Sequence, residues 1–512
     1  MPRLPTDRLR RLELGRAWRS AGAVPDTVPP LVLFEREGNA DRVAALCETA
    51  SAAGLRPGLG LAEARARFPG FDFRPREREA EARLLGAVAD WCDRYTPLVA
   101  VDAPFGLLLD ISGCAHLFGG EKALVDDLLT RLFALGLAAE AVVASHPGAA
   151  LALVGHVASG PLAPGEEAEA VRPLPVEALR LDPELAAKLR RLGLKRVGQL
   201  LDLPRESLAK RFGEALTERL AEASGRRRRP ISPRRIVPSL IAERRFAEPI
   251  ALLEDVERVI LFLAARLERD LERRGEGGRR FELSLFRLDG HVEHVGVGAA
   301  APVREAERIA RLFRERLAGA AERPDAGFGY DLIRLGVPLA EAMPDRQVEL
   351  DRSEALGEED LVALLDRLSA RLGEASVTAT LLAGSHWPER AERRQTAGAA
   401  LGARDKSAAP HREAPPETDR PTRLLDRPEP VEITQLLPEG PPLHFRWRRA
   451  LHVVKSFEGP ERIAAEWWRD AAAPARDYYR IEDERGRRYW LFRQTAARDA
   501  ARPDWFMHGL FA

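Results

Sequence analysis

Hydrophobic and polar positions repeat with two different periods in the first third of the chain, and both periods predict regular structure. Residues 77–97 place apolar side chains such as Val88 and Trp91 on one face of a helix. Residues 99–109 alternate, turn at an Ala-Pro-Phe-Gly segment and continue into three leucines, as a strand hairpin does. Strands and helices predicted in this way follow one another through residues 31–158, which indicates a mixed sheet with helices packed on it.

Two further predictions concern the N-terminal part of the chain. Thr6 and Asp7 precede an amphipathic stretch and are expected to cap a helix over residues 8–18. Residues 41–70 are predicted to form two helices joined by a glycine-rich turn.

The middle of the chain changes first to short helices and then to an α+β pattern. Residues 171–235 are predicted to form several short helices with a glycine hairpin at residues 192–198. Residues 240–340 are predicted to form two helices and three strands. Residues 397–420 are polar and rich in Pro and Ala without apolar periodicity, so we expect a flexible linker there.

Composition limits the classes of protein that remain possible. The chain has 512 residues, enough for several domains with their own cores, and its 79 Lys and Arg balance its 79 Asp and Glu. Any surface that attracts nucleic acid must therefore be local. Three scattered cysteines argue against a disulfide framework and favour a reducing compartment. No apolar run is long enough to span a membrane and no signal sequence is evident, so we expect a soluble, cytoplasmic protein.

The ten histidines do not form a metal-binding motif. His291 and His294 lie three residues apart on a predicted strand and are expected to face opposite sides of it. No metal site and no cofactor are predicted.

One region of the chain is strongly basic. Residues 171–240 contain 17 Lys and Arg against 8 Asp and Glu. A glycine hairpin between short helices can point backbone N–H groups at a phosphate, so we favour contact with a DNA backbone over a merely solvated basic bundle. The residues expected to make this contact are Gly193, Lys195, Arg196, Gly198, Arg226, Arg227, Arg228 and Arg229.

The predicted hairpin of residues 99–109 is flanked by two carboxylates, Asp102 and Asp110. Nucleotidyl transferases present carboxylates at strand ends, because two Mg²⁺ ions must be held by oxygen ligands at the reacting phosphate. From the pattern alone, a buried strand followed by a turn remains the alternative.

Six motifs occur in order in the tail: SHWPERA (385–391), RPTRLLDRPEP (420–430), HFRWRRALH (444–452), GPERIAAEWW (459–468), RDYYRIED (476–483) and WFMHGLFA (505–512). With these motifs the chain resembles the ImuB family, the catalytically inactive polymerase-like component of the bacterial mutagenesis cassette. The order of its segments is similar to that of Y-family (translesion) DNA polymerases.

This resemblance implies an α+β multidomain fold with a separate C-terminal domain. The implied domains are a palm and fingers with a truncated first strand (1–170), a helix-hairpin-helix thumb (171–238), an α+β little finger (239–340), a clamp-motif segment and extension (341–396), a flexible linker (397–420) and a C-terminal protein-interaction domain (421–512).

The resemblance also shows where catalytic residues should stand. Active members carry Asp-Glu five and four positions before the Asp that corresponds to Asp110, and here Phe105 and Gly106 occupy these positions. By resemblance, Met1 or Pro2 occupies the position of a first-strand Asp. Since neither metal ligands nor a metal site remain, the resemblance implies a pseudo-polymerase without catalytic residues.

A short segment after the little finger resembles the pentapeptide that binds the bacterial sliding clamp. It consists of Gln347, Val348, Glu349, Leu350 and Asp351. In this motif Gln and a later apolar residue enter pockets of the clamp while the segment lies extended. Asp351 departs from the usual final apolar residue, and an exposed linker is the alternative.

Residues 421–512 hold five of the eight tryptophans. Tyr and Trp are enriched in binding hot spots, although some of these side chains could instead fill a small core. The resemblance implies that the tail recruits a RecA-like accessory protein (ImuA) and an error-prone replicative-type polymerase subunit. The residues expected to bind partners are Trp467, Trp468, Trp505, Phe506 and Phe511, and residues at the chain end are expected to lie outside the core.

Three functions therefore compete. The first is a non-catalytic scaffold in translesion synthesis that links the sliding clamp, primer-template DNA, the accessory protein and the polymerase subunit. The second is an active translesion polymerase with displaced ligands such as Asp102 and Asp110. The third is a helix-hairpin-helix DNA-binding protein unrelated to synthesis. The missing carboxylates argue against the second and the tail motifs against the third, so we expect the scaffold.

Overall fold

The computed structural model describes residues 1–20, 28–163, 165–227, 229–319, 324–343, 353–404, 420–436, 440–470, 474–494 and 504–511. The chain divides into two compact units, residues 1–350 and 351–512. Among the described residues, no helix is long and apolar enough to cross a membrane.

The first unit begins with helix α1 (Leu4–Leu14) and a small sheet. Strand β1 (Leu31–Glu37) pairs antiparallel with β2 (Ala40–Leu46) and parallel with β3 (Asp72–Pro75), and two short helices, α2 (Glu48–Ala52) and α3 (Leu61–Arg67), lie between β2 and β3 in the chain. Two predictions are wrong here. The first helix starts before Thr6 and Asp7, which lie inside it, and residues 41–46 form a strand rather than a helix.

A helix and a hairpin form the centre of this part of the molecule. Helix α4 (Arg78–Cys92) is followed by the antiparallel pair β4 (Val99–Asp102) and β5 (Gly106–Leu109), and then by α5 (Glu121–Ala134). Residues such as Val88, Trp91 and Leu128 pack into one core between these elements. This agrees with the amphipathic helix and the hairpin that the sequence pattern predicts.

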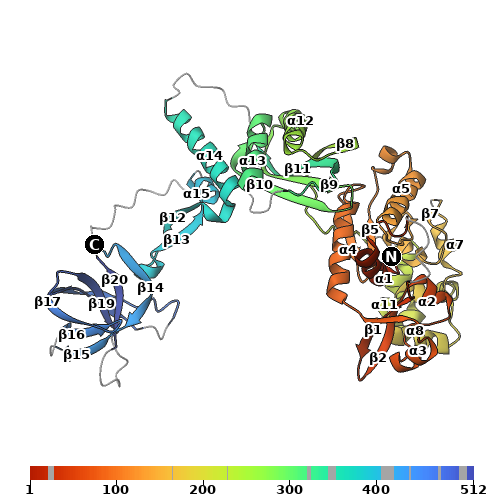
Figure 1. Ribbon diagram of the computed structural model, residues 1–512, viewed down its shortest axis with the longest axis horizontal. Coiled ribbons are helices and arrows are strands. Elements are labelled where there is room, and N and C mark those ends of the chain that lie inside the picture. The colour runs from red at the N-terminus through yellow and green to blue at the C-terminus, as the bar shows by residue number, and fades with distance from the viewer. Residues whose placement is uncertain are drawn as a thin grey trace. The chain divides into compact units, whose positions relative to one another are not determined.

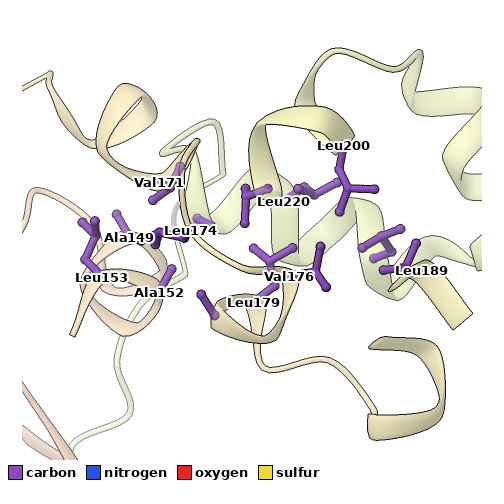
Figure 2. Close-up of a cluster of buried hydrophobic side chains, with 14 of the residues drawn as sticks. Ala149, Ala152, Leu153, Val171, Leu174, Val176, Leu179, Leu189, Leu200 and Leu220 are labelled. Atoms are coloured by element: carbon purple, nitrogen blue, oxygen red, sulfur yellow. The ribbon is translucent and has the colours of Figure 1, made fainter. Parts of the chain in front are cut away.

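Short helices form the next region. They are α6 (Pro147–Leu153), α7 (Glu167–Val171), α8 (Pro183–Arg191), α9 (Val197–Leu201), α10 (Arg205–Phe212) and α11 (Glu214–Ala223), and the two-residue strands β6 (Val142–Val143) and β7 (Gly160–Pro161) lie beside them in the chain. Figure 2 shows their common core, in which Leu153 of α6, Val171 of α7 and Leu220 of α11 are buried.

An antiparallel sheet with the strand order β10-β9-β11-β8 completes the first unit. Its strands are β8 (Leu240–Ile250), β9 (Glu276–Arg287), β10 (Val292–Val303) and β11 (Tyr330–Ala342). Helices α12 (Leu253–Arg274) and α13 (Ala306–Gly319) pack against each other and against this sheet (Figure 1). The sequence did not predict β8.

The second unit contains a small helical module and a curled sheet. The module consists of α14 (Ser353–Leu372), the hairpin β12 (Thr378–Leu382) and β13 (Glu392–Thr396), and α15 (Ala397–Arg404). Helix α15 lies in the stretch predicted to be a flexible linker, so that prediction is wrong for residues 397–404.

The curled sheet has seven antiparallel strands in the order β14-β20-β19-β18-β17-β16-β15 (Figure 1). They are β14 (Arg423–Pro430), β15 (Glu432–Leu436), β16 (Pro442–Trp447), β17 (Ala450–Ile463), β18 (Arg476–Asp483), β19 (Arg488–Gln494) and β20 (Trp505–Leu510). Successive residues point to opposite faces, so Tyr478 and Trp490 belong to one hydrophobic cluster and Tyr479 and Leu491 to another. Strands β18 and β19 therefore carry a hydrophobic cluster on each face of the sheet.

A segment from outside the predicted C-terminal domain contributes to one of these cores. Trp387, which lies between β12 and β13, is 5% exposed and packs with Tyr478 and Trp490. Its indole Nε1 donates to the carbonyl oxygen of Ala464 at 3.0 Å, and the guanidinium carbon of Arg476 lies 3.9 Å from its ring centroid. Residues 385–391 therefore form a strap, named so below, across the curled sheet.

Candidate active site and nucleic-acid interface

The turn between β4 and β5 carries the positions at which catalytic carboxylates are expected. Phe105 packs against the core of α4 and α5, and the guanidinium of Arg76 lies over its ring, 5.3 Å from the centroid. A Cβ atom at Gly106 would lie only 2.7 Å from Asp102 Oδ2 and 2.9 Å from the Asp102 carbonyl oxygen. Position 105 therefore offers no oxygen ligand, and position 106 has no room for any side chain in this conformation.

The two carboxylates that do flank the hairpin already have partners. Asp102 forms an ion pair with Arg180, which follows the short 3₁₀ turn after α7. Asp110 Oδ1 accepts a hydrogen bond of 2.9 Å from the backbone N–H of Ser112. Within the described parts of the chain, neither belongs to a group of three or more side chains that could bind a metal.

A cavity of about 1140 Å³ adjoins the hairpin. Met1, Pro2, Phe105 and Gly106 all line it, so the two positions of the expected Asp-Glu pair lie on the same cavity as Met1 and Pro2, one of which stands in the place of a first-strand Asp by resemblance. The amino group of Met1 donates to the Phe105 carbonyl oxygen at 3.0 Å. The rest of the lining is largely apolar and comes mainly from β5, α5, β6 and α6, with charged residues such as Arg180 and Arg229 at other points.

Asp7 is held inside the fold. It is 1% exposed, pairs with Arg19 at 2.7 Å and accepts a hydrogen bond of 2.8 Å from the backbone N–H of Ala138. Burial raises the pKa of Asp7, and these partners oppose that shift. Its contacts tie α1 to the segment after α5 rather than capping a helix.

The glycine hairpin between α8 and α9 does not present backbone N–H groups to solvent. Gln199 Oε1 accepts from the N–H groups of Lys195 and Arg196 at 2.8 and 2.9 Å. The N–H groups of Val197 and Gly198 donate to carbonyl oxygens of the segment after α7, each at 2.9 Å. The N–H of Gly193 donates to Arg190 within the turn. The prediction that these N–H groups face outward is therefore wrong, whereas the side chains of Lys195 and Arg196 are exposed.

The arginines after α11 differ in their surroundings. Arg226, Arg227 and Arg229 are exposed, and Arg227 pairs with Glu218 at 2.6 Å. Among the described residues, Arg226 and Arg229 form no salt bridge. Arg228 lies outside the described residues.

One group of possible metal ligands has no recognisable motif in the sequence. Asp90, Asp93 and His294 place ligand atoms within 4.8 Å of one another. Burial raises the pKa of Asp93 to about 6. Arg234 and Arg235 both pair with Asp90, the latter at 3.1 Å. Two guanidinium groups therefore already balance the negative charge of this carboxylate without a metal ion.

These side chains belong to an ion-pair cluster that joins α4 to the sheet of β8–β11. In the same contact, Arg94 pairs with Asp331 at 2.6 Å, and both side chains are almost fully buried. No sequence motif signals either contact, because the partners are some 200 residues apart in the chain.

The residues expected to bind protein partners differ in their surroundings. The clamp-motif residues 347–351 lie outside the described residues. Trp505 is 3% exposed and belongs to the core, so the expectation that it lies outside the core is wrong. Phe506 and Phe511 are partly buried, whereas Trp467 and Trp468 are 73% and 58% exposed.

Comparison with known proteins decides the family. Residues 237–352 match the impB/mucB/samB family C-terminal domain. Protein ImuB of Caulobacter vibrioides is 41% identical over 468 residues, which cover 90% of this chain and all of that protein. The chain belongs to the ImuB family.

Some relatives outside the ImuB family are DNA polymerases. DNA polymerase IV of Halorhodospira halophila is 30% identical over 330 residues, which cover 61% of this chain and 88% of that protein. DinB from Sulfolobus solfataricus, a solved structure, aligns with 62% of this chain and 92% of its own at 15% identity and a TM-score of 0.35. This ImuB-family chain is thus a Y-family polymerase homologue of mixed α+β architecture with an additional C-terminal domain.

Proposed function

We propose that the protein is a non-catalytic scaffold in DNA-damage-induced translesion synthesis and mutagenesis. The observation that carries this proposal is the hairpin turn, where Phe105 and Gly106 offer no metal ligand and a side chain at position 106 would collide with Asp102. Two-metal nucleotidyl transfer needs several oxygen ligands around the reacting phosphate. The ion pair with Arg180 also removes Asp102 as a ready substitute.

The proposed scaffold holds primer-template DNA and proteins. Exposed Lys195, Arg196, Arg226 and Arg229 supply sequence-independent contacts to the DNA backbone, which position DNA without reading bases. The proposed protein partners are the bacterial sliding clamp, the RecA-like accessory protein (ImuA) and the error-prone polymerase subunit that carries out synthesis.

Primer extension tests the absence of catalysis. The purified chain is expected to add no nucleotide to a primer-template with either Mg²⁺ or Mn²⁺, because the hairpin cannot hold the two metal ions. The double variant Phe105→Asp/Gly106→Glu is also expected to stay inactive, since the new Glu collides with Asp102. Extension by the unaltered chain that is lost in Asp102→Asn or Asp110→Asn would instead establish the active polymerase with displaced ligands.

A pull-down with purified sliding clamp tests the motif at residues 347–351. The variant Gln347→Ala/Leu350→Ala is expected to lose most clamp binding, because these two side chains are the proposed anchors in the clamp pockets. The matched control is Glu349→Ala, which lies between them and should bind as the unaltered chain does. Equal retention of all three proteins would remove this assignment.

A further inference from the structure

The cavity beside the hairpin of β4 and β5 is bordered by two pairs of strands that do not bond to each other. Within the described parts of the chain, β5 pairs only with β4, and β6 pairs only with β7. Residues of both β5 and β6 line the cavity, together with side chains of α5 and α6. Each of these two strands therefore has one edge without a partner strand, and both strands border the same space.

One cross-strand hydrogen bond shows which backbone groups of β5 are left over. The N–H of Asp110 donates to the carbonyl oxygen of Leu98 at 3.0 Å, so in this register the even-numbered residues of β5 bond to β4. Leu107 and Leu109 direct their N–H and C=O groups away from β4. The amino group at the start of the chain, which lines the cavity, donates to Phe105 on the same edge at 3.0 Å. The free edge of β5 therefore faces the cavity.

Strand β6 has a free edge for the same reason. The carbonyl oxygens of Ala141 and Val143 accept hydrogen bonds of 3.0 and 2.9 Å from N–H groups of β7 and of the residue that follows it. Alternate residues of a strand face opposite sides, so Val142 and Ala144 direct their N–H and C=O groups away from β7. All four of these residues line the cavity. Two rows of backbone donors and acceptors thus border it.

The lining restricts what can occupy the cavity. Leu128 and Leu129 of α5 and Leu151 and Val154 of α6 contribute to it, so an occupant must be apolar on this side. A small apolar molecule would displace water from the two strand edges and leave their N–H and C=O groups without hydrogen bonds, which is unfavourable. An extended peptide meets both conditions, because its backbone bonds to a strand on each side and every second side chain points to one face.

The size of the cavity and the state of the two strand pairs favour the same occupant. Ligand pockets usually measure about 300–1,000 Å³. The cavity, at about 1140 Å³, has room for several residues of peptide. Isolated two-stranded pairs are marginally stable in water, and one strand between β5 and β6 would join both pairs into a single sheet.

We propose that this cavity is a slot for one extended segment of a protein partner, with apolar side chains at alternate positions, which pairs with β5 on one side and with β6 on the other. All described strands of this chain are already members of a sheet, so none of them is available to fill the slot. The inference goes beyond the proposed scaffold function, because it uses neither the clamp motif nor the exposed arginines nor the C-terminal domain.

Hydrogen exchange of the full-length chain, read at single amides, tests the proposal. The probe is a capped synthetic peptide of alternating valine and threonine with a lysine at each end. Exchange at Leu107, Leu109, Val142 and Ala144 is expected to slow by about tenfold or more at saturation, because these N–H groups become hydrogen bonded. Leu108 is the internal control, since its N–H already bonds to β4 and its exchange should not change.

A modified peptide provides the matched control. Methylation of alternate backbone nitrogens keeps every side chain but removes the donors to one of the two strands. This peptide is expected to bind about tenfold more weakly or worse, because carbonyl oxygens on one edge of the slot then stay without a partner.

Three results would overturn the proposal. If the first peptide leaves exchange at the four amides of the slot unchanged, the slot does not accept a strand. If the methylated peptide protects these amides equally well, the cavity binds apolar groups without strand pairing. If the four amides are already protected in the chain alone, this chain or a second copy fills the slot instead of a partner. Since the test uses neither DNA nor the sliding clamp, the proposed scaffold function stands in all three cases.

Discussion

Trp387→Ala is expected to destabilise the curled C-terminal sheet by about 3–5 kcal/mol, the usual cost of truncating a buried aromatic side chain. Its indole packs with Tyr478 and Trp490, and its N–H bond to Ala464 would be lost as well. Arg476 would also lose the aromatic face on which it lies. Hydrogen exchange of the backbone amides of β18, β19 and β20 in the full-length chain measures the effect.

A nearby residue provides the control for this prediction. Leu382 lies five positions before Trp387 and is 85% exposed, so Leu382→Ala should leave exchange in these strands unchanged. Amides of β18–β20 that remain equally protected in Trp387→Ala would show that the strap does not stabilise the sheet.

Arg226→Ala/Arg229→Ala is expected to weaken binding to primer-template DNA by roughly a hundredfold at 50 mM salt and to reduce the salt dependence of binding. Each phosphate contact contributes about 0.9 to the slope of log K against log salt concentration, so loss of two contacts lowers its magnitude by about 1.8. Fluorescence anisotropy with a labelled primer-template, measured over a salt series, gives both numbers.

Arg227 is the matched control for the DNA prediction. Its guanidinium is already paired with Glu218, and the charge lost in Arg227→Ala is partly neutralised before DNA binds. A smaller effect on affinity and slope is expected. If the double variant and this control bind DNA with equal slopes, the contact lies elsewhere on the protein.

Local patterns predicted those parts of the fold in which local interactions dominate. The amphipathic repeat gave α4, and alternation with a turn gave the hairpin of β4 and β5. Strand β2 was predicted as a helix, because its fold depends on pairing with β1 rather than on the helix-forming residues that it contains. Strand β8 was missed for the same reason, since its charged residues reach partners on β11 and in the segment after α4.

The candidate sites follow the same rule: positions set by local spacing could be identified from the sequence, and contacts with distant segments could not. Counting positions from Asp110 identified Phe105 and Gly106, and the structure adds that position 106 is sterically closed. The glycine hairpin between α8 and α9 was predicted wrongly, because the carbonyl groups that accept from Val197 and Gly198 lie in a segment about 25 residues earlier. Trp505 was placed at the surface because it is near the chain end, although β20 pairs on both sides with β14 and β19.

The strap has a consequence for inserting a peptide into the chain between residues 404 and 420. Helix α15 on one side contacts the hairpin that carries the strap, and Arg420 on the other side pairs with Glu461 of β17. The chain on both sides of residues 405–419 is therefore fixed to the same folded unit. The entropic cost of closing a flexible peptide inserted there grows by only about 0.6 kcal/mol for each doubling of its length, so we expect such an insertion to leave hydrogen exchange in the curled sheet unchanged.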